Sequence, residues 1–153
     1  MAASEDGNDD MVRKLLSVGM VDVNCANYNG STPIMKSSLI GNKSIVQMLI
    51  GGGADPNKAN KFGDNPLQLS AMSGSPEVVR LLLDNGAHPN KATYIYRGTP
   101  LHIAAWRGLK DVAQLLLDGG ADPKKANAWG DTPLSFAQEK GHMEIEQMMN
   151  RKI

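Results

Sequence analysis

The sequence predicts an all-α solenoid of stacked helix pairs joined by β-hairpin-like turns, and three observations support this prediction. The first is a set of prolines that recur 33, 34 and 33 residues apart: Pro33, Pro66, Pro100 and Pro133. The second is the residue before each proline, which is Thr or Asn, because Thr-Pro and Asn-Pro are typical of helix starts. The third is an apolar, glycine-terminated segment that follows each proline at a similar distance. A fixed period of this size is typical of stacked repeats, in which each unit contacts mainly its neighbours.

The unit 60–92 shows why each element is expected. Gly63 permits positive φ in the opening turn. Pro66 occupies the first position of a short helix, and Pro76 does the same for a second helix. Gly86 is placed to end the second helix in a left-handed conformation. The apolar face of the second helix is formed by Val78, Val79, Leu81, Leu82 and Leu83.

The same order of turn, short helix, turn and apolar helix recurs along the chain. It divides the single domain, residues 1–153, into a partial unit 1–26 and four full units, 27–59, 60–92, 93–126 and 127–153. The last helix is polar on its outer side, as a terminal cap requires. The first unit has no comparable cap and opens in mid-helix, as a piece of a longer protein would. An insertion of about one residue falls in the turn Thr93–Arg97.

Composition limits the class of protein. The 153 residues fit one domain, and 41% hydrophobic with 21% charged residues is typical of a globular protein. Sixteen basic and sixteen acidic residues leave no net charge to direct the chain to nucleic acid or to an anionic membrane. Cys25 is the only cysteine, which suits a reducing compartment. No apolar run approaches the roughly 20 residues that span a bilayer, and the acidic N-terminus is unlike a signal peptide. We expect a cytoplasmic or nuclear protein without membrane insertion.

The stretch Gly98–Gly108, Gly-Thr-Pro-Leu-His-Ile-Ala-Ala-Trp-Arg-Gly, and the apolar helix that follows it resemble the ankyrin repeat nearly position for position. The resemblance spans the whole chain and implies an ankyrin-repeat solenoid that binds another protein or peptide on its concave face. It also implies that His102 bonds back to the neighbouring turn. Met35, Gln68 and Ser135 occupy the same position in the other units, and the resemblance implies that these units are held less firmly.

No catalytic, cofactor or metal site is indicated. None of the histidines has a metal-ligating partner at the required spacing. Glu144 and Glu146 lie two residues apart, which places them on different faces of a helix. Gly51–Gly53 stands at a helix end and lacks the Lys-Ser/Thr of a phosphate-binding loop. Cys25 has no recurring histidine nearby to activate it. We predict no enzymatic activity, no cofactor and no metal.

The residues outside the repeat pattern predict the binding surface. In the ankyrin fold the turn tips and the end of each first helix face outward, and six of the seven aromatic residues fall there. Only Phe136 occupies a position expected to be buried. Exposed aromatic residues with arginine neighbours are typical of binding hot spots. Packing of each tip aromatic on the next turn is the alternative interpretation. The predicted partner-binding residues are Tyr28, Leu39, Ile40, Phe62, Asp64, Met72, Tyr94, Ile95, Tyr96, Trp106, Arg107, Trp129 and Asp131.

These observations favour a non-catalytic protein-interaction module that is monomeric by itself. Two alternatives stay open: an ankyrin region that regulates a larger enzyme, channel or scaffold, and a small stand-alone inhibitor of an enzyme. Direct catalysis and nucleic-acid binding are disfavoured, because polar residues form no catalytic group and basic residues are neither in excess nor clustered. Asn24, Asn57 and Asn90 occupy a position that can be hydroxylated in the family, and a turn-stabilising role is the favoured interpretation.

Overall fold

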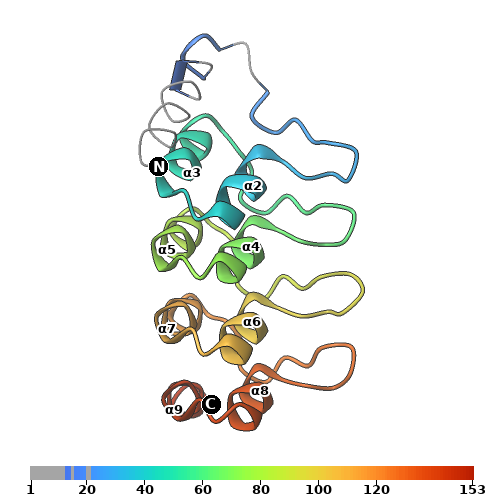
Figure 1. Ribbon diagram of the computed structural model, residues 1–153, viewed down its shortest axis with the longest axis vertical. Helices are drawn as coiled ribbons and strands as arrows, with labels where there is room; N and C mark the ends of the chain where they lie inside the picture. Colours follow the sequence, from blue (N-terminus) through green and yellow to red (C-terminus); the bar gives the residue numbers. More distant parts are fainter. Residues whose placement is uncertain (1–12, 15, 20–21) are drawn as a thin grey trace.

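The computed structural model describes residues 13–14, 16–19 and 22–153, and the regular elements of this part are all α-helices. They are α2 (Pro33–Ile40), α3 (Lys43–Gly51), α4 (Pro66–Ser73), α5 (Pro76–Asp84), α6 (Pro100–Arg107), α7 (Lys110–Asp118), α8 (Pro133–Glu139) and α9 (Met143–Asn150). Figure 1 shows two rows of helices, with α2, α4, α6 and α8 in the inner row and α3, α5, α7 and α9 in the outer row. The predicted all-α solenoid is confirmed. The predicted partial unit 1–26 lies largely outside the described residues.

The inner helices begin and end where the sequence predicts. Each has its proline in the first turn. At α4 the Asn65 side chain accepts a hydrogen bond from the Gln68 backbone N–H at 3.1 Å, which satisfies one of the free donors at the helix start. Helix α4 ends at Gly74, whose φ of 75° is the left-handed conformation that glycine adopts at low cost.

The hydrophobic core lies between the two rows and runs without interruption along the stack. Leu67, Leu82, Leu101 and Leu116 are fully buried in it. Each inner helix packs against the next inner helix and against its own outer helix. Because no helix pair could bury its apolar faces alone, the neighbours provide the stability. At the C-terminal end, α9 buries Ile145 and Met149, Met148 packs partly buried against the core, and the rest of the helix is polar or exposed.

The connecting loops are hydrogen-bonded hairpins that project to one side of the stack (Figure 1). Each is closed by a backbone bond of about 3 Å, for example from Asn60 N–H to the carbonyl of Asp64 at 2.9 Å. Neighbouring hairpins are also joined, as when Tyr94 N–H donates to the Phe62 carbonyl at 3.0 Å. The predicted β-hairpin-like turns are therefore present, although no strand is assigned in the described residues.

Asparagines connect successive units in the loops that follow the C-terminal ends of the outer helices. The Asn57 amide donates to the Gly86 carbonyl and its oxygen accepts from His88 N–H, both at 2.8 Å. Asn24 and Asn90 make the same pair of bonds with the units that follow them. The three asparagines thus hold each unit to the next, because both ends of each amide are used. No described helix has the length and apolar character needed to span a bilayer.

Candidate protein-binding surface

The inner helices expose a face made of three rows of side chains. The rows lie three, six and seven residues after the proline that starts each helix, and positions three and four apart share one helix face. We call this set the inner face: Lys36, Leu39, Ile40, Leu69, Met72, Ser73, Ile103, Trp106, Arg107, Phe136, Glu139 and Lys140. The rows six and seven residues after the proline were predicted from the sequence. The row three residues after the proline was missed, although its spacing of three residues from the helix-end positions could have identified it.

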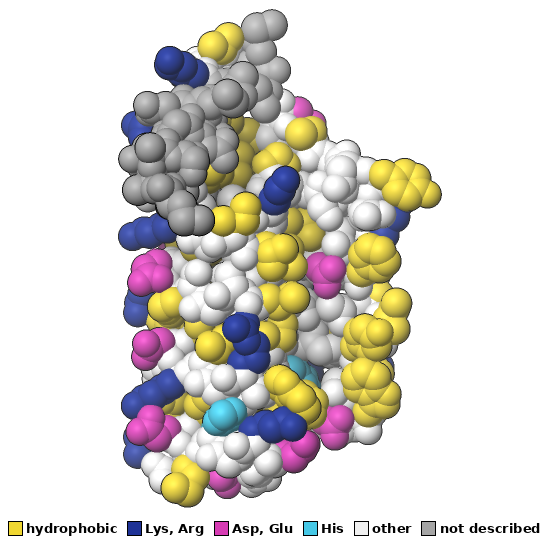
Figure 2. Space-filling view, viewed as in Figure 1, with side chains coloured by type: hydrophobic (Ala, Val, Ile, Leu, Met, Phe, Trp, Pro, Cys, Tyr) yellow, Lys and Arg dark blue, Asp and Glu magenta, His cyan; other side chains and the backbone are white. Residues whose placement is uncertain are grey.

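The predicted apolar residues are all exposed. Thirteen large hydrophobic side chains are exposed in the described part of the chain, and ten of them belong to the predicted set. Their exposed fractions run from 46% for Leu39 to 88% for Tyr28. In Figure 2 hydrophobic side chains gather over the projecting hairpins and over the inner helices. The ten residues are Tyr28, Leu39, Ile40, Phe62, Met72, Tyr94, Ile95, Tyr96, Trp106 and Trp129.

The hairpin aromatics also pack on neighbouring hairpins. The rings of Tyr96 and Trp129 are stacked, with centroids 5.2 Å apart and planes at 24°. Tyr94 lies against Gly63, where an added Cβ would come within 2.5 Å of the Tyr94 nitrogen. Even so, Tyr96 and Trp129 keep 57% and 68% of their surface exposed. Packing on the next turn and availability to a partner therefore coexist, and stacking fixes the rings in place.

The hairpin 93–98 differs from the others in its polar support. In the hairpin 60–64, the Asn60 side-chain oxygen accepts backbone N–H bonds from Phe62 and Asp64 at 2.9 and 3.0 Å. Thr93 takes the place of this asparagine, and its buried hydroxyl has no hydrogen-bond partner. Arg97 has a φ of 53° and is the one non-glycine residue with positive φ in the described part. Arg97 thus adopts a conformation that costs about 1–2 kcal/mol for a side chain with a Cβ.

An apolar pocket of about 350 Å³ opens on the inner face among α4, α6 and α8. It is lined by Met72, His102, Ile103, Trp106, Arg107 and Phe136. The rings of Trp106 and Phe136 meet edge to face, with centroids 5.2 Å apart and planes at 71°. The prediction that Phe136 is buried is only partly correct: its side chain is half-buried and forms a wall of the pocket. Phe136 lies on α8, and no described inner helix packs on the far side of α8 to cover it.

His102 has a structural role beneath this pocket. Its Nδ1 accepts a bond from Thr99 N–H at 3.0 Å, and its Nε2 lies 3.1 Å from the Asp131 carbonyl. Because Nδ1 accepts, the proton resides on Nε2, which donates to that carbonyl. Burial lowers the pKa of His102 below its ordinary value of 6.5. The bond back to the next turn, which the family resemblance implied, is therefore present.

Charged side chains border the pocket. The Arg107 guanidinium donates to the Met72 carbonyl across the gap between units, and no described carboxylate pairs with it. The Lys140 ammonium lies 3.5 Å from the centroid of the Trp106 ring and pairs with Glu139 at 3.0 Å. A cation over an indole is attracted by its π-face.

The carboxylates of the two predicted acidic contact residues lie against asparagine amides in their own hairpins. The Asp64 carboxylate accepts from the Asn60 amide at 3.1 Å, and Asp131 lies 3.5 Å from the Asn127 amide. Both aspartates are half-buried in their hairpins.

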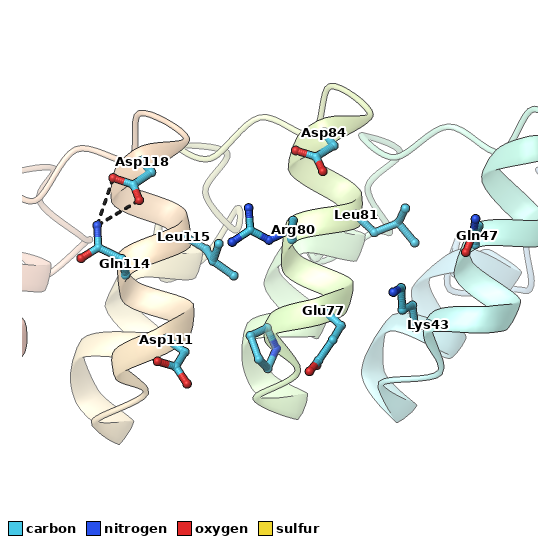
Figure 3. A pocket seen from close by; sticks show the side chains of 11 residues that line it. Lys43, Gln47, Glu77, Arg80, Leu81, Asp84, Asp111, Gln114, Leu115 and Asp118 are labelled. Carbon is cyan, nitrogen blue, oxygen red and sulfur yellow. Dashed lines mark hydrogen bonds between the residues drawn. The ribbon is translucent and has the colours of Figure 1, made fainter.

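Two further hollows lie away from this pocket. One of about 840 Å³ lies beside α2 and includes Cys25 and Leu39. The other, of about 590 Å³, crosses the outer helices α3, α5 and α7 and is lined by side chains of both charges (Figure 3). In it, hydrogen bonds from Gln114 at 3.0 Å and from Lys152 lower the pKa of Asp118. Among the described residues, no group of three or more His, Cys, Asp or Glu side chains is placed to hold a metal ion.

The chain matches the family model described as ankyrin repeats (3 copies) over residues 1–93 and 38–127. A search of curated proteins finds no match. The family match spans most of the chain and agrees with the stacked helix pairs and hydrogen-bonded hairpins. The chain belongs to the ankyrin-repeat family.

Proposed function

We propose that this chain is a non-catalytic module that binds a partner protein or peptide across its concave side, through the inner face and the hairpin tips. Ankyrin repeats generally serve as protein–protein interaction modules. The observation that carries the proposal is that, of the thirteen large apolar side chains exposed in the described part of the chain, ten lie on these elements. A contiguous exposed apolar surface of this kind is typical of an interaction site.

Contacts between neighbouring hairpins hold the tip side chains in place, which favours high affinity for a partner. Tyr96 and Trp129 are stacked, and their hairpins are joined by a bond from Ala128 N–H to the Tyr96 carbonyl at 2.9 Å. Side chains that are already ordered lose little entropy on binding. Trp and Tyr are also the residues most enriched in binding hot spots. We therefore assign Tyr96, Trp106 and Trp129 to the centre of the interface.

Two observations support a non-catalytic role, which is typical of ankyrin repeat domains. Both ring nitrogens of His102 face backbone groups, so this ring is not free to transfer protons. Cys25 is an exposed free thiol, and no histidine lines the hollow beside it. A free thiol also supports placement in the cytoplasm or nucleus.

The experiment compares Tyr96→Ala and Trp106→Ala with a matched control, Met143→Ala. Met143 is 69% exposed but lies on α9, outside the proposed surface. Against a partner purified by affinity capture, each aromatic variant should lose about 1–2 kcal/mol of binding free energy or more. The control should bind as the unchanged chain does, and urea unfolding of all three variants checks that each is folded under the binding conditions. Normal binding by both aromatic variants would refute the surface assignment.

A regulatory region of a larger protein and a stand-alone inhibitor would use the same surface. Measuring the native size of the protein from its source distinguishes them. A species of about 16.4 kDa, alone or bound to an enzyme, supports the inhibitor. A longer polypeptide that contains these repeats supports the regulatory region.

A further inference from the structure

We propose that the pocket among α4, α6 and α8 binds a bulky apolar side chain from an acidic segment of the partner, and that a carboxylate next to that side chain pairs with Arg107. The proposal rests on the proposed function and specifies the chemistry of the partner at that surface. Three features of the structure support it: the lining of the pocket, the state of Arg107, and the distribution of charge over the two sides of the stack.

The volume and the lining of the pocket fit one apolar side chain. Its volume of about 350 Å³ is at the small end of the range for ligand pockets, about 300–1,000 Å³, which suits one large side chain. Ile103, Trp106 and Phe136 supply aliphatic and aromatic walls. The polar atoms of His102 are turned away into the fold, where they bond to Thr99 and Asp131. An apolar side chain entering this pocket would displace water without leaving a polar group unsatisfied.

Arg107 supplies the polar part of the recognition. It lines the same pocket, is exposed, and forms no ion pair with a described residue. Its bond to the Met72 carbonyl anchors the guanidinium at the pocket edge. A guanidinium has five N–H donors, so this bond leaves donors for a carboxylate. Lys140 is a weaker candidate, because it already pairs with Glu139.

Charge is divided between the two sides of the stack, although the chain has no net charge. The inner face and hairpin tips carry four cations that form no ion pair among the described residues: Lys36, Lys61, Arg97 and Arg107. The acids on this side are already engaged, since Asp64 and Asp131 are held in hairpins and Glu139 pairs with Lys140. The hollow across the outer helices is lined by four acids, Glu77, Asp84, Asp111 and Asp118, and two bases, Lys43 and Arg80 (Figure 3). Asp118 pairs with Lys152, so three acids that form no ion pair among the described residues stand against the two bases. An acidic partner is therefore attracted to the inner side and repelled from the outer side.

A protein segment fits this surface better than a nucleic acid. Nucleic-acid binding depends on a continuous basic groove that follows the phosphates. Here the basic and acidic totals are equal, and Arg107 is the one basic residue in the lining of the pocket. The apolar lining adds nothing for a phosphate and suits a buried side chain. Binding of single-stranded nucleic acid is kept as an outcome of the test.

The test selects random dodecapeptides displayed on phage against the full chain, and measures the enriched peptides by fluorescence polarisation. We expect a consensus in which a Leu, Met or aromatic residue adjoins Asp or Glu. Arg107→Glu should weaken these peptides by about tenfold or more, and changing the peptide's acid to Lys should restore part of the loss. Arg80→Glu, a charge reversal on the outer helices, should leave their affinity unchanged. An oligothymidylate is measured in parallel.

The outcomes separate this proposal from the proposed function. Enriched peptides that need Trp106 but show no acidic preference, or bind Arg107→Glu normally, overturn the acidic-partner proposal and leave the binding surface standing. Peptides that bind equally well to Trp106→Ala and Tyr96→Ala overturn both. A selection with no enrichment overturns the peptide proposal. Tighter binding of oligothymidylate than of any peptide, lost in Arg107→Glu, overturns it in favour of nucleic acid. Ile103→Glu provides a second variant that blocks the pocket from a different residue, should Trp106→Ala lower stability.

Discussion

The indole of Trp106 meets the ring of Phe136 edge to face, with 5.2 Å between centroids, although the two residues belong to successive repeats. This contact joins α6 to α8 and shapes the apolar pocket on the inner face. It also links stability to binding, because the same ring that packs between units forms a wall of the proposed site. Substitutions at Phe136 therefore test stability and binding together.

We expect Phe136→Ala to lower the free energy of unfolding by about 2 kcal/mol, less than for a fully buried Phe because the ring is half-exposed. It should also abolish the pocket and weaken pocket-binding peptides. Phe136→Leu keeps apolar volume and should cost less than about 1.5 kcal/mol. Urea unfolding and fluorescence polarisation measure the two effects. Equal stability of the Ala variant and the unchanged chain would show that the contact does not hold α6 to α8.

We expect Met35→His to stabilise the chain. Thr32 is buried and its hydroxyl has no hydrogen-bond partner, because Met35 occupies the position that His102 holds beside Thr99. A histidine there can bond to Thr32 and to the next hairpin, as His102 does, and should add about 1 kcal/mol. The reverse change, His102→Met, should destabilise by about 1–3 kcal/mol by leaving the Thr99 hydroxyl unpaired. Chemical denaturation of both variants measures the two changes in the free energy of unfolding. A loss of stability in Met35→His or a gain in His102→Met would contradict the prediction.

We expect stability to fall in acid through His102. Its pKa is lowered in the folded state by burial, so below its ordinary value of 6.5 the unfolded chain takes up a proton more readily than the folded chain. The contribution is complete above that value and is lost as pH falls through the folded-state pKa. The control is His102→Gln, because Gln68 occupies the same position and donates to the Gly98 carbonyl at 2.9 Å. Urea unfolding between about pH 5 and 7.5 should show a smaller loss for the variant, and identical slopes would exclude His102 as the source.

We expect Arg97→Gly to raise the free energy of unfolding by about 0.5–1 kcal/mol. Arg97 has a φ of 53°, and glycine adopts that conformation without the steric cost of a Cβ. Arg97→Ala is the matched control, because it removes the charge and the long side chain but keeps the Cβ. Thermal or urea unfolding should show a gain for Gly and none for Ala. A gain of the same size in both would assign the effect to charge rather than to backbone conformation.

The helices and most of the exposed surface could be predicted because local signals determine them. A proline after Thr or Asn starts each inner helix, and a left-handed glycine such as Gly74 ends α2, α4 and α6. The pocket could not be predicted, since it depends on Phe136 meeting Trp106 across a repeat boundary. The hydrogen bonds of Asn57 could not be predicted either, because its partners lie 29 and 31 residues away. Thr93 stands where Asn60 supports the preceding hairpin, and its unsatisfied hydroxyl appears only in the folded hairpin.

The most direct test of the binding surface uses the two tryptophans, because both lie on it and the chain has no others. In a ¹⁵N-labelled sample, the indole N–H signals of Trp106 and Trp129 are followed while a selected peptide or partner is added. We expect both signals to shift and saturate together, while backbone signals of α5 and α7 on the outer row stay in place. Indole signals that do not move while those of α5 and α7 do would contradict the account and place the partner on the outer helices.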